Sequence, residues 1–219
     1  MERCLEKEIM DGEEQVRAYA QADFSKENQW FVEQFLDTFP EFREGLILDL
    51  GCGPADIPIR LVHSCTEFNI LGVDASALMI TAAQEAIREA NCGERIRAVC
   101  QRIQDVVLEE RADAVISNSL VHHIPNPFQF WYALRQLAKP GAPVLVMDLL
   151  RPESVEEAQA LVDHYAADEP EQLRLDFYNS LLAAFSEDEV AAHLAEMNLS
   201  RLLIDVPDER HWIVAGRVY

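Results

Sequence analysis

The feature that most restricts the fold is a series of short apolar runs separated by stretches with helical periodicity. Strands are predicted at residues 46–50, 69–74, 96–100, 112–117 and 142–149, with weaker ones at 201–206 and 211–218. These runs are short and are bounded by turn residues, which favours strands over helices. The early runs are apolar almost throughout, which is typical of strands that are covered on both faces.

Helices are predicted between these strands, at residues 54–64, 76–91 and 127–138. The alternation of strand and helix predicts an α/β fold with a doubly wound, mostly parallel sheet of seven strands. Residues 1–36 are expected to form an N-terminal helical cap. Residues 153–184 are expected to insert two more helices after the fifth strand, and the sequence SEDE at 186–189 predicts a capped helix start. A length of 219 residues suits a single domain over 1–219.

Composition limits the partners that the chain can have. It carries 39 acidic and 18 basic residues, a formal net charge of −21, and the basic residues are scattered. Such a surface repels phosphate backbones and anionic lipid, so neither nucleic acid nor a membrane is an expected partner. The acidic N-terminus does not resemble a signal peptide, and no apolar run approaches the ~20 residues of a membrane span. A cytoplasmic location is therefore expected, while the oligomeric state stays open.

The cysteines indicate neither a disulfide framework nor a metal site. The chain has five of them, and no CxxC spacing occurs. Free thiols in a reducing compartment are the simplest interpretation, and no metal is predicted.

A glycine turn follows the first predicted strand, in the stretch ILDLGCGPADIP at 47–58. Ligands of doubly wound sheets bind beyond the carboxyl ends of the strands. Gly51 and Gly53 would let the backbone turn tightly and approach such a ligand closely. A tight turn without any ligand is the alternative that this motif alone leaves open.

Asp74 ends the second predicted strand, where a carboxylate can accept both ribose hydroxyls of an adenosine. This placement fits NAD and S-adenosylmethionine alike. Pro54 lacks an amide donor, and Asp56 brings a negative charge to the position where a pyrophosphate would lie. Both residues argue against a diphosphate cofactor.

Several segments together carry a family resemblance. The stretches ILDLGCGPADIP, ILGVDASALMITAA, RIQDV, DAVISNSLVHHI and LAKPGAPVLVMDLLRP stand in the order and spacing of class I S-adenosylmethionine-dependent methyltransferases. They look most like the small-molecule branch related to the quinone-biosynthesis C-methylases. The resemblance covers about residues 45–151 and implies a Rossmann-like methyltransferase fold with a helical lid. It also implies S-adenosylmethionine as methyl donor and S-adenosylhomocysteine as product.

The resemblance also assigns residues to the cofactor. The backbone turn would wrap the methionine half, Asp74 would hold the ribose, and Asp105 would accept from the adenine amine. An aromatic residue near the N-terminus would close over the ligand. The full set of expected cofactor-binding residues is Tyr19, Asp49, Gly51, Cys52, Gly53, Asp74, Ala75, Met79, Gln104, Asp105, Val106, Asn118 and Ser119.

The methyl acceptor is less well indicated. In related small-molecule enzymes a histidine at the position of His122 or His123 faces the active site. His122 is the predicted catalytic residue, as a base or a hydrogen-bond partner, and His123, Arg151 and Tyr178 are predicted to bind the acceptor. The alternative is that the two histidines only stabilise their loop and take no part in catalysis or binding. Asp148 is expected to be structural.

Three other interpretations stay open at this point. The chain could be a non-catalytic module that binds S-adenosylmethionine, or a methyltransferase for a protein or RNA. It could also be an NAD-linked oxidoreductase, which Pro54 and Asp56 disfavour.

Overall fold

The computed structural model describes residues 1–6 and 9–219. Its strands form a single seven-stranded sheet in the order β3-β2-β1-β4-β5-β7-β6. They are β1 (Gly45–Leu50), β2 (Phe68–Asp74), β3 (Ile96–Cys100), β4 (Ala114–Asn118), β5 (Pro143–Leu149), β6 (Leu203–Asp205) and β7 (His211–Arg217). Strands β1 to β5 are parallel, whereas β7 runs antiparallel to both β5 and β6. The prediction of a mostly parallel, seven-stranded sheet is confirmed.

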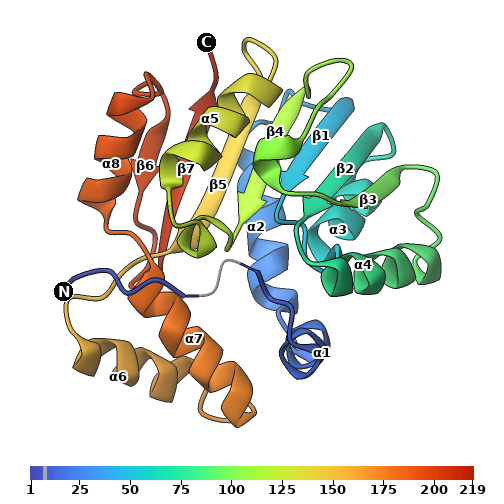
Figure 1. The fold of residues 1–219 in the computed structure, drawn as a ribbon. Coiled ribbons are helices and arrows are strands. Elements are labelled where there is room, and N and C mark those ends of the chain that lie inside the picture. Colours follow the sequence, from blue (N-terminus) through green and yellow to red (C-terminus); the bar gives the residue numbers. More distant parts are fainter. Residues whose placement is uncertain (7–8) are drawn as a thin grey trace.

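The helices lie close to their predicted positions (Figure 1). They are α1 (Glu13–Gln21), α2 (Ser25–Thr38), α3 (Asp56–Ser64), α4 (Ala77–Glu89), α5 (Pro127–Leu137), α6 (Val155–Tyr165), α7 (Glu171–Ala183) and α8 (Glu187–Glu196). Ser76 caps α4 by accepting from Met79 N, and Ser186 forms a full capping box with Glu189. Two short 3-10 turns, η1 (Ile103–Asp105) and η2 (Val121–His123), follow β3 and β4.

The expected N-terminal helical cap is only partly helical. Its first helix begins at Glu13, and residues 1–6 carry no helix. Instead, the N–H of Cys4 donates to Leu182 O at 2.9 Å, which holds this N-terminal segment (residues 1–6) against the end of α7. The expectation for residues 7–8 lies outside the described residues.

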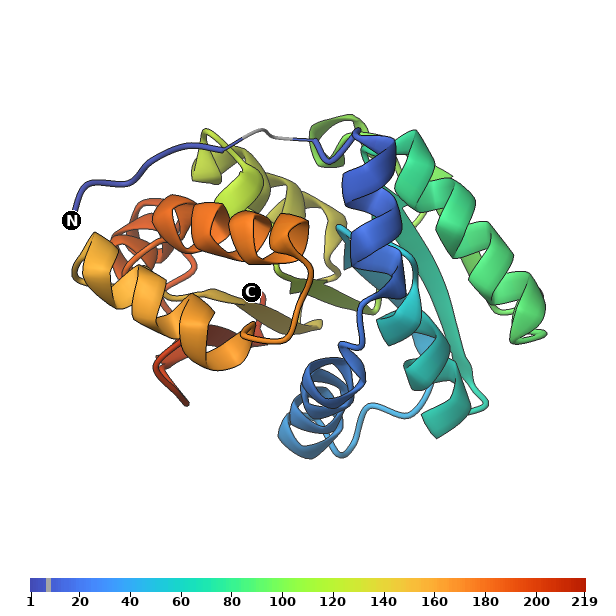
Figure 2. The same ribbon diagram turned by 90° about the horizontal axis from the view of Figure 1, so that it is seen from below.

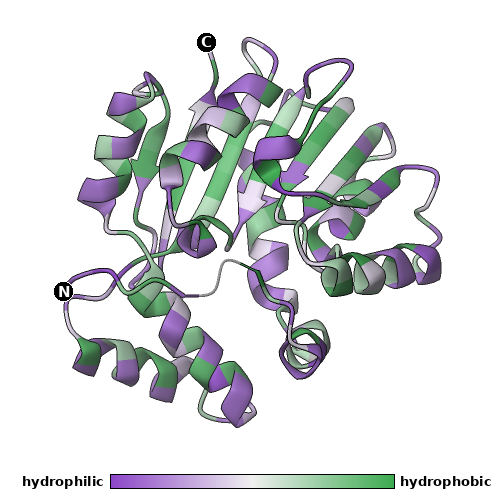
Figure 3. Cartoon of the chain, viewed as in Figure 1, coloured by the Kyte–Doolittle hydropathy of each residue, from purple (hydrophilic) through white to green (hydrophobic). Residues whose placement is uncertain are grey.

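Helices cover both faces of the sheet because alternate strand residues point to opposite faces. On one face, buried residues such as Leu48 and Val146 pack against α5 and α8, around Trp131. On the other face, residues such as Ile47 pack against α2, α3 and α4, around Phe35. The hydropathy colouring of Figure 3 shows this arrangement as apolar strands between amphipathic helices. Burial on both faces explains why the strand sequences are apolar throughout.

The carboxyl edge of the sheet carries additional helices (Figure 2). Helices α6 and α7 pack together around Leu161 and Leu181, and this cluster includes Leu149 at the end of β5. Helix α1 is joined to α7 by a hydrogen bond from Gln15 Nε2 to Asp176 Oδ1 at 3.0 Å. Helix α1 and the insertion after β5 therefore meet over the same edge, although they are far apart in sequence.

Candidate active site

A cavity of about 290 Å³ lies at the carboxyl edge, where β1, β2, β4 and β5 end. Its wall includes residues from the sheet, from α1, α2 and α4, and from the helices inserted after β5. Ten of the predicted site residues line it, namely Tyr19, Gly51, Gly53, Asp74, Ala75, Met79, Asn118, Ser119, His122 and His123. These residues come from distant parts of the sequence, and the fold brings them together around one cavity.

The glycine turn forms one wall of this cavity. Gly51 has φ 78°, and a Cβ there would lie 2.9 Å from the Cβ of Leu120, so a side chain would collide with its neighbour. The N–H of Gly51 donates to Val73 O at 2.8 Å, which ties the turn to β2. A Cβ on Gly53 would meet no atom within 4 Å, so this backbone borders open space in the cavity. The turn thus offers bare main chain to a ligand.

Asp74 is held in place before any ligand binds. Its Oδ2 accepts from Gly53 N at 3.0 Å and its Oδ1 accepts from Ser76 N at 2.8 Å. Burial raises the pKa of Asp74, and these two backbone hydrogen bonds act in the opposite direction. The carboxylate therefore links the glycine turn to the start of α4 and stands at the cavity wall.

Asp49 lies behind the turn and is 2% exposed. Burial and, to a smaller extent, the charge of Asp74 raise its pKa to about 8. It is not one of the residues that line the cavity. A cationic ligand in the cavity would favour the ionised form of Asp49.

Asp49→Asn is expected to stabilise the fold increasingly as the pH rises. Because the folded pKa of about 8 lies above the ordinary value of 3.8, the folded state keeps a proton that the unfolded state loses. The free energy of unfolding then falls between these values, by at most about 1.4 kcal/mol per pH unit. Asparagine does not titrate in this range. In urea denaturation, the free energy of unfolding of the variant should therefore exceed that of the wild type by more at about pH 8 than at about pH 5.

Asp113→Asn is the matched control at the opposite edge of the sheet. Asp113 is partly buried, but hydrogen bonds from Lys139 and Leu46 N lower its pKa. Its contribution to stability is lost only as the pH falls below the ordinary range of a carboxyl group. The effect of Asp113→Asn should therefore be flat over the tested pH range. If the change in the free energy of unfolding caused by Asp49→Asn were also independent of pH, Asp49 would not be a buried, protonated carboxyl group.

The end of β4 contributes an acceptor without a partner. Asn118 Oδ1 is buried and accepts no hydrogen bond from any residue in the described part of the chain. The next residue, Ser119, has φ 54°, and its N–H donates to Met147 O at 2.9 Å. Buried polar atoms are normally satisfied, so the amide oxygen of Asn118 fits a ligand that brings a hydrogen-bond donor.

His122 stands in a buried network with acidic residues on both sides. Its Nδ1 lies 2.5 Å from Asp148 Oδ1, and its Nε2 lies 3.4 Å from Glu6 Oε1. Asp148 Oδ2 also accepts from Val121 N at 2.5 Å, which fixes the carboxylate. Burial alone would lower the pKa of His122, but the carboxylate of Asp148 outweighs burial and raises the pKa. Asp148 thus sets the orientation of the His122 ring, a role that goes beyond the structural one expected for it.

Other predicted residues lie outside the cavity wall. The side chain of Cys52 faces β2, since a Cβ on Gly72 would lie 2.8 Å from its Sγ. Gln104, Asp105 and Val106 lie in and directly after η1, beyond the end of β3, where Gln104 and Asp105 are exposed. Their assignment to the cofactor stays a prediction, as does that of Asp49 and Cys52.

Two predicted acceptor residues are also placed elsewhere. The Nη2 atom of Arg151 pairs with Glu189 Oε2 at 3.0 Å, which directs the guanidinium toward the start of α8. Tyr178 packs against the cluster between α6 and α7. Neither residue lines the cavity. An ion pair holds Arg151, and apolar contacts hold Tyr178. A role in acceptor binding remains a prediction for both residues.

Sequence reasoning did not single out several residues of the site. Glu6 reaches the His pair from the N-terminal segment, and Asp176 and Glu169 line the cavity from the lid side. Arg210, which the sequence places with His211 at the start of the last strand, lines the cavity as well, and its guanidinium lies 3.7 Å from the centroid of the Tyr165 ring. An acidic residue in a helical insertion carries no signal of its own, since solvated helix faces are acidic as well.

Charge distinguishes the cavity from an anion site. Its lining residues include Asp23, Glu27, Asp74, Glu169 and Asp176, whereas Arg210 is the one lysine or arginine among the described lining residues. Carboxylates of this density favour a cationic ligand and disfavour a diphosphate.

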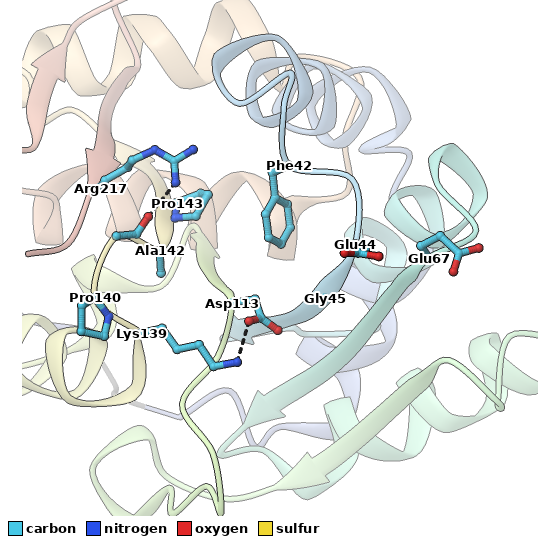
Figure 4. A pocket seen from close by; sticks show the side chains of 11 residues that line it. Phe42, Glu44, Gly45, Glu67, Asp113, Lys139, Pro140, Ala142, Pro143 and Arg217 are labelled. Carbon is cyan, nitrogen blue, oxygen red and sulfur yellow. Dashed lines mark hydrogen bonds and ion pairs between the residues drawn. The ribbon is translucent and has the colours of Figure 1, made fainter.

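A larger hollow of about 540 Å³ lies at the opposite edge of the sheet (Figure 4). It is bordered by the start of β1 and β5, and Lys139 Nζ pairs there with Asp113 Oδ1 at 2.6 Å. Ligands of doubly wound sheets bind at the carboxyl ends of the strands, so the smaller cavity is the candidate site. None of the helices in the described part of the chain has the length and apolar content that crossing a bilayer requires.

The sequence and the fold have known counterparts. Residues 47–142 match the family model described as methyltransferase domain. Over 101 residues the chain is 27% identical to a protein of Schizosaccharomyces pombe described as an uncharacterized methyltransferase. This match covers 43% of the chain and 36% of the relative, so it spans little more than a third of the relative's length.

Solved structures resemble the fold over most of its length. A protein of Methanococcus maripaludis assigned as an S-adenosyl-L-methionine-dependent methyltransferase has a TM-score of 0.75 at 20% identity, covering 100% of this chain and 98% of that one. The plantazolicin methyltransferase in complex with a triazolic desmethylPZN analog and SAH has a TM-score of 0.70 at 13% identity, with coverages of 93% and 91%. A SAM-dependent methyltransferase of Aquifex aeolicus has a TM-score of 0.69 at 16% identity, with coverages of 94% and 98%.

Proposed function

We propose that the chain is a methyltransferase that transfers a methyl group from S-adenosylmethionine to a small-molecule acceptor; its match to the methyltransferase-domain model over residues 47–142 and the likeness of its fold to solved methyltransferases support this proposal. The main support is the acid-lined cavity beyond the glycine turn, with Asp74 fixed at its wall. The donor brings a sulfonium and an ammonium group but no phosphate, which suits carboxylates and bare main chain. The sequence motifs favour the branch related to the quinone-biosynthesis C-methylases. The acidic chain is proposed to work in the cytoplasm.

The residues present fit this donor. Asp74 can accept the ribose hydroxyls, and the backbone of Gly51 and Gly53 leaves room for the methionine half. The amide oxygen of Asn118 can accept from the ammonium group, which would satisfy its unpaired acceptor. Met79 and Ala75 supply apolar contact for the adenine. The donor contributes an electrophilic methyl group; the chain contributes alignment and an environment of the right charge.

Alignment accounts for most of the expected rate. Holding the acceptor atom, the methyl group and the sulfur in line can supply about 7–11 kcal/mol of the barrier. Helices α1, α6 and α7 contribute to the cavity wall, together with Ile9 and Met10, and are proposed to act as a lid that excludes water. His122 remains the predicted catalytic residue. It lines the cavity, and Asp148 orients its ring.

Ligand-dependent unfolding tests this function directly. The melting temperature should rise with S-adenosylmethionine and with S-adenosylhomocysteine, because each binds the folded state alone, and at 100 times the Kd the gain is about 2.7 kcal/mol. NAD⁺ at the same concentration should give no rise. If neither adenosyl ligand shifts the melting temperature, the proposal is wrong. A shift without turnover on a broad panel of small acceptors would support a non-catalytic binding module instead.

A further inference from the structure

We propose that Glu6, His122 and His123 form a site for a divalent transition metal ion, and that the methyl acceptor binds this ion through an ionisable oxygen or sulfur. Glu6 comes from the N-terminal segment, while the two histidines form part of η2. The acceptor role rests on the proposed methyl transfer, whereas the metal site itself does not.

The geometry of the three side chains matches a metal site. Glu6 Oε1 lies 3.2 Å from His123 Nδ1 and 3.4 Å from His122 Nε2, and one ligand atom of each residue lies within 4.8 Å of the others. Zinc binds nitrogen and carboxylate oxygen at about 2.0–2.2 Å in a tetrahedral arrangement, which separates neighbouring ligand atoms by about 3.3–3.6 Å. The observed separations from Glu6 are close to this edge length. Two imidazoles and one carboxylate also form a common catalytic zinc set with an open fourth position.

The positions of the ligand atoms leave a place for a cation. Asp148 accepts from the N–H at Nδ1 of His122 at 2.5 Å, so in the neutral ring Nε2 carries a lone pair. That lone pair faces the carboxylate of Glu6, which itself has only lone pairs to offer when ionised. A proton or a metal ion can lie between these two groups. His123 approaches the same carboxylate oxygen, and a metal ion can bind all three groups at once.

The surroundings have the features of a supported metal site. A metal-bound histidine commonly donates its other N–H to a carboxylate, and Asp148 has this relation to His122. Ser180 Oγ donates to Glu6 Oε1 at 3.0 Å and fixes the third ligand. Arg3 Nη2 donates to His122 O at 2.7 Å and Arg3 Nε donates to Ala183 O at 2.5 Å, which ties the N-terminal segment to η2 and α7. Thus the N-terminal segment, which carries Glu6, and η2, which carries the two histidines, are each held by their own hydrogen bonds.

The site opens toward the cavity. The side chains of His123 and Glu6 are 13% and 14% exposed, and both histidines line the cavity. An ion held there would have its remaining position directed to the space where an acceptor must bind. It would also place a positive charge among the acidic lining residues, which lowers the pKa of a bound hydroxyl or thiol.

The transfer step then balances without another reagent. The acceptor group X–H releases its proton to solvent when X binds the metal ion, and the metal-bound X⁻ attacks the methyl carbon. The new X–C bond forms as the C–S bond breaks. The electron pair of the C–S bond stays with sulfur. The sulfonium becomes the neutral thioether of S-adenosylhomocysteine, so the products are methylated acceptor, thioether and one proton.

Metal binding can be tested on the full chain without any acceptor. Protein stripped with a chelator is titrated with Zn²⁺ by calorimetry, and with Co²⁺ while the visible absorption is recorded. We expect one ion per folded chain and a Co²⁺ spectrum typical of nitrogen and oxygen ligands in a tetrahedral site. His123→Gln should weaken Zn²⁺ binding by at least about 100-fold. His63→Gln, at an exposed histidine outside the cavity, should leave the affinity unchanged.

The outcomes separate the alternatives. If the folded wild-type chain binds no Zn²⁺ or Co²⁺, the inference is wrong and a proton lies between the Glu6 and His122 groups. Equal affinity in the wild type and in a folded His123→Gln variant, checked by circular dichroism, would also overturn it. The adenosyl-ligand shifts are measured on the same samples. Metal binding without such shifts would preserve the metal site and contradict the methyltransferase function, and the reverse result would contradict the metal site alone.

Discussion

Asp74→Ala is expected to abolish most of the binding of S-adenosylmethionine, with an increase in Kd of at least about 100-fold. Hydrogen bonds to a charged group contribute about 1.5–3 kcal/mol each, and a single carboxylate would serve two ribose hydroxyls. The loss should be visible in calorimetry and as an absent rise in melting temperature. Asp74 also accepts from Gly53 N and Ser76 N, so the variant disturbs the glycine turn as well.

Asp113→Ala separates the two effects. Asp113 likewise accepts a backbone N–H, from Leu46 at 2.8 Å, but at the amino edge of the sheet. Both alanine variants should therefore lose stability, and only Asp74→Ala should lose donor affinity. Asp74→Asn keeps one acceptor oxygen and should give an intermediate Kd. Wild-type affinity in Asp74→Ala would show that the ribose binds elsewhere.

His122→Asn is expected to lower kcat by at least about 100-fold on any acceptor that the wild type methylates. The expected loss is the same whether His122 removes a proton from the acceptor or holds a metal ion that lowers the acceptor's pKa. Asparagine is chosen because its amide can still donate to Asp148, which keeps the buried carboxylate satisfied. Formation of S-adenosylhomocysteine measures the rate.

Donor affinity provides the control for this variant. His122 belongs to the acceptor side of the cavity in this assignment, so the Kd for S-adenosylmethionine should change by less than about threefold. His164→Asn alters an exposed histidine on α6 and should leave both kcat and Kd unchanged. Undiminished turnover by His122→Asn would leave alignment alone as the source of the rate. A large loss of donor affinity would instead place His122 on the donor side.

The position of the glycine turn and Asp74 at one cavity could be predicted because it depends on strand order. Gly51 and Asp74 follow neighbouring parallel strands, and the carboxyl ends of such strands meet at one edge. Local sequence therefore suffices to place both residues at one cavity. Met79 follows directly from the helix that begins after Asp74, where Ser76 supplies the cap.

The acceptor side depends on contacts that local patterns do not encode. Glu6 meets His122 across more than half of the chain, from a segment that was expected to be helical. Arg151 follows β5 toward the rim as expected, but the nearby Glu189 of the capping box binds its guanidinium. The arginine that lines the cavity is instead Arg210, whose side chain rests on the ring of Tyr165. Tertiary partners decide which of several possible cations faces the ligand.

The reversed direction of β7 has a consequence for how this scaffold can diversify. Strands β2, β4 and β5 bring their last residues to the cavity, whereas β7 runs the other way and brings its first residue, His211, next to Arg210. The turn that precedes it, at 206–210, lies outside the crossovers that connect the parallel strands. Under the proposed function, exchange of that turn is expected to change acceptor preference more than donor affinity, which makes the turn a target for redesign.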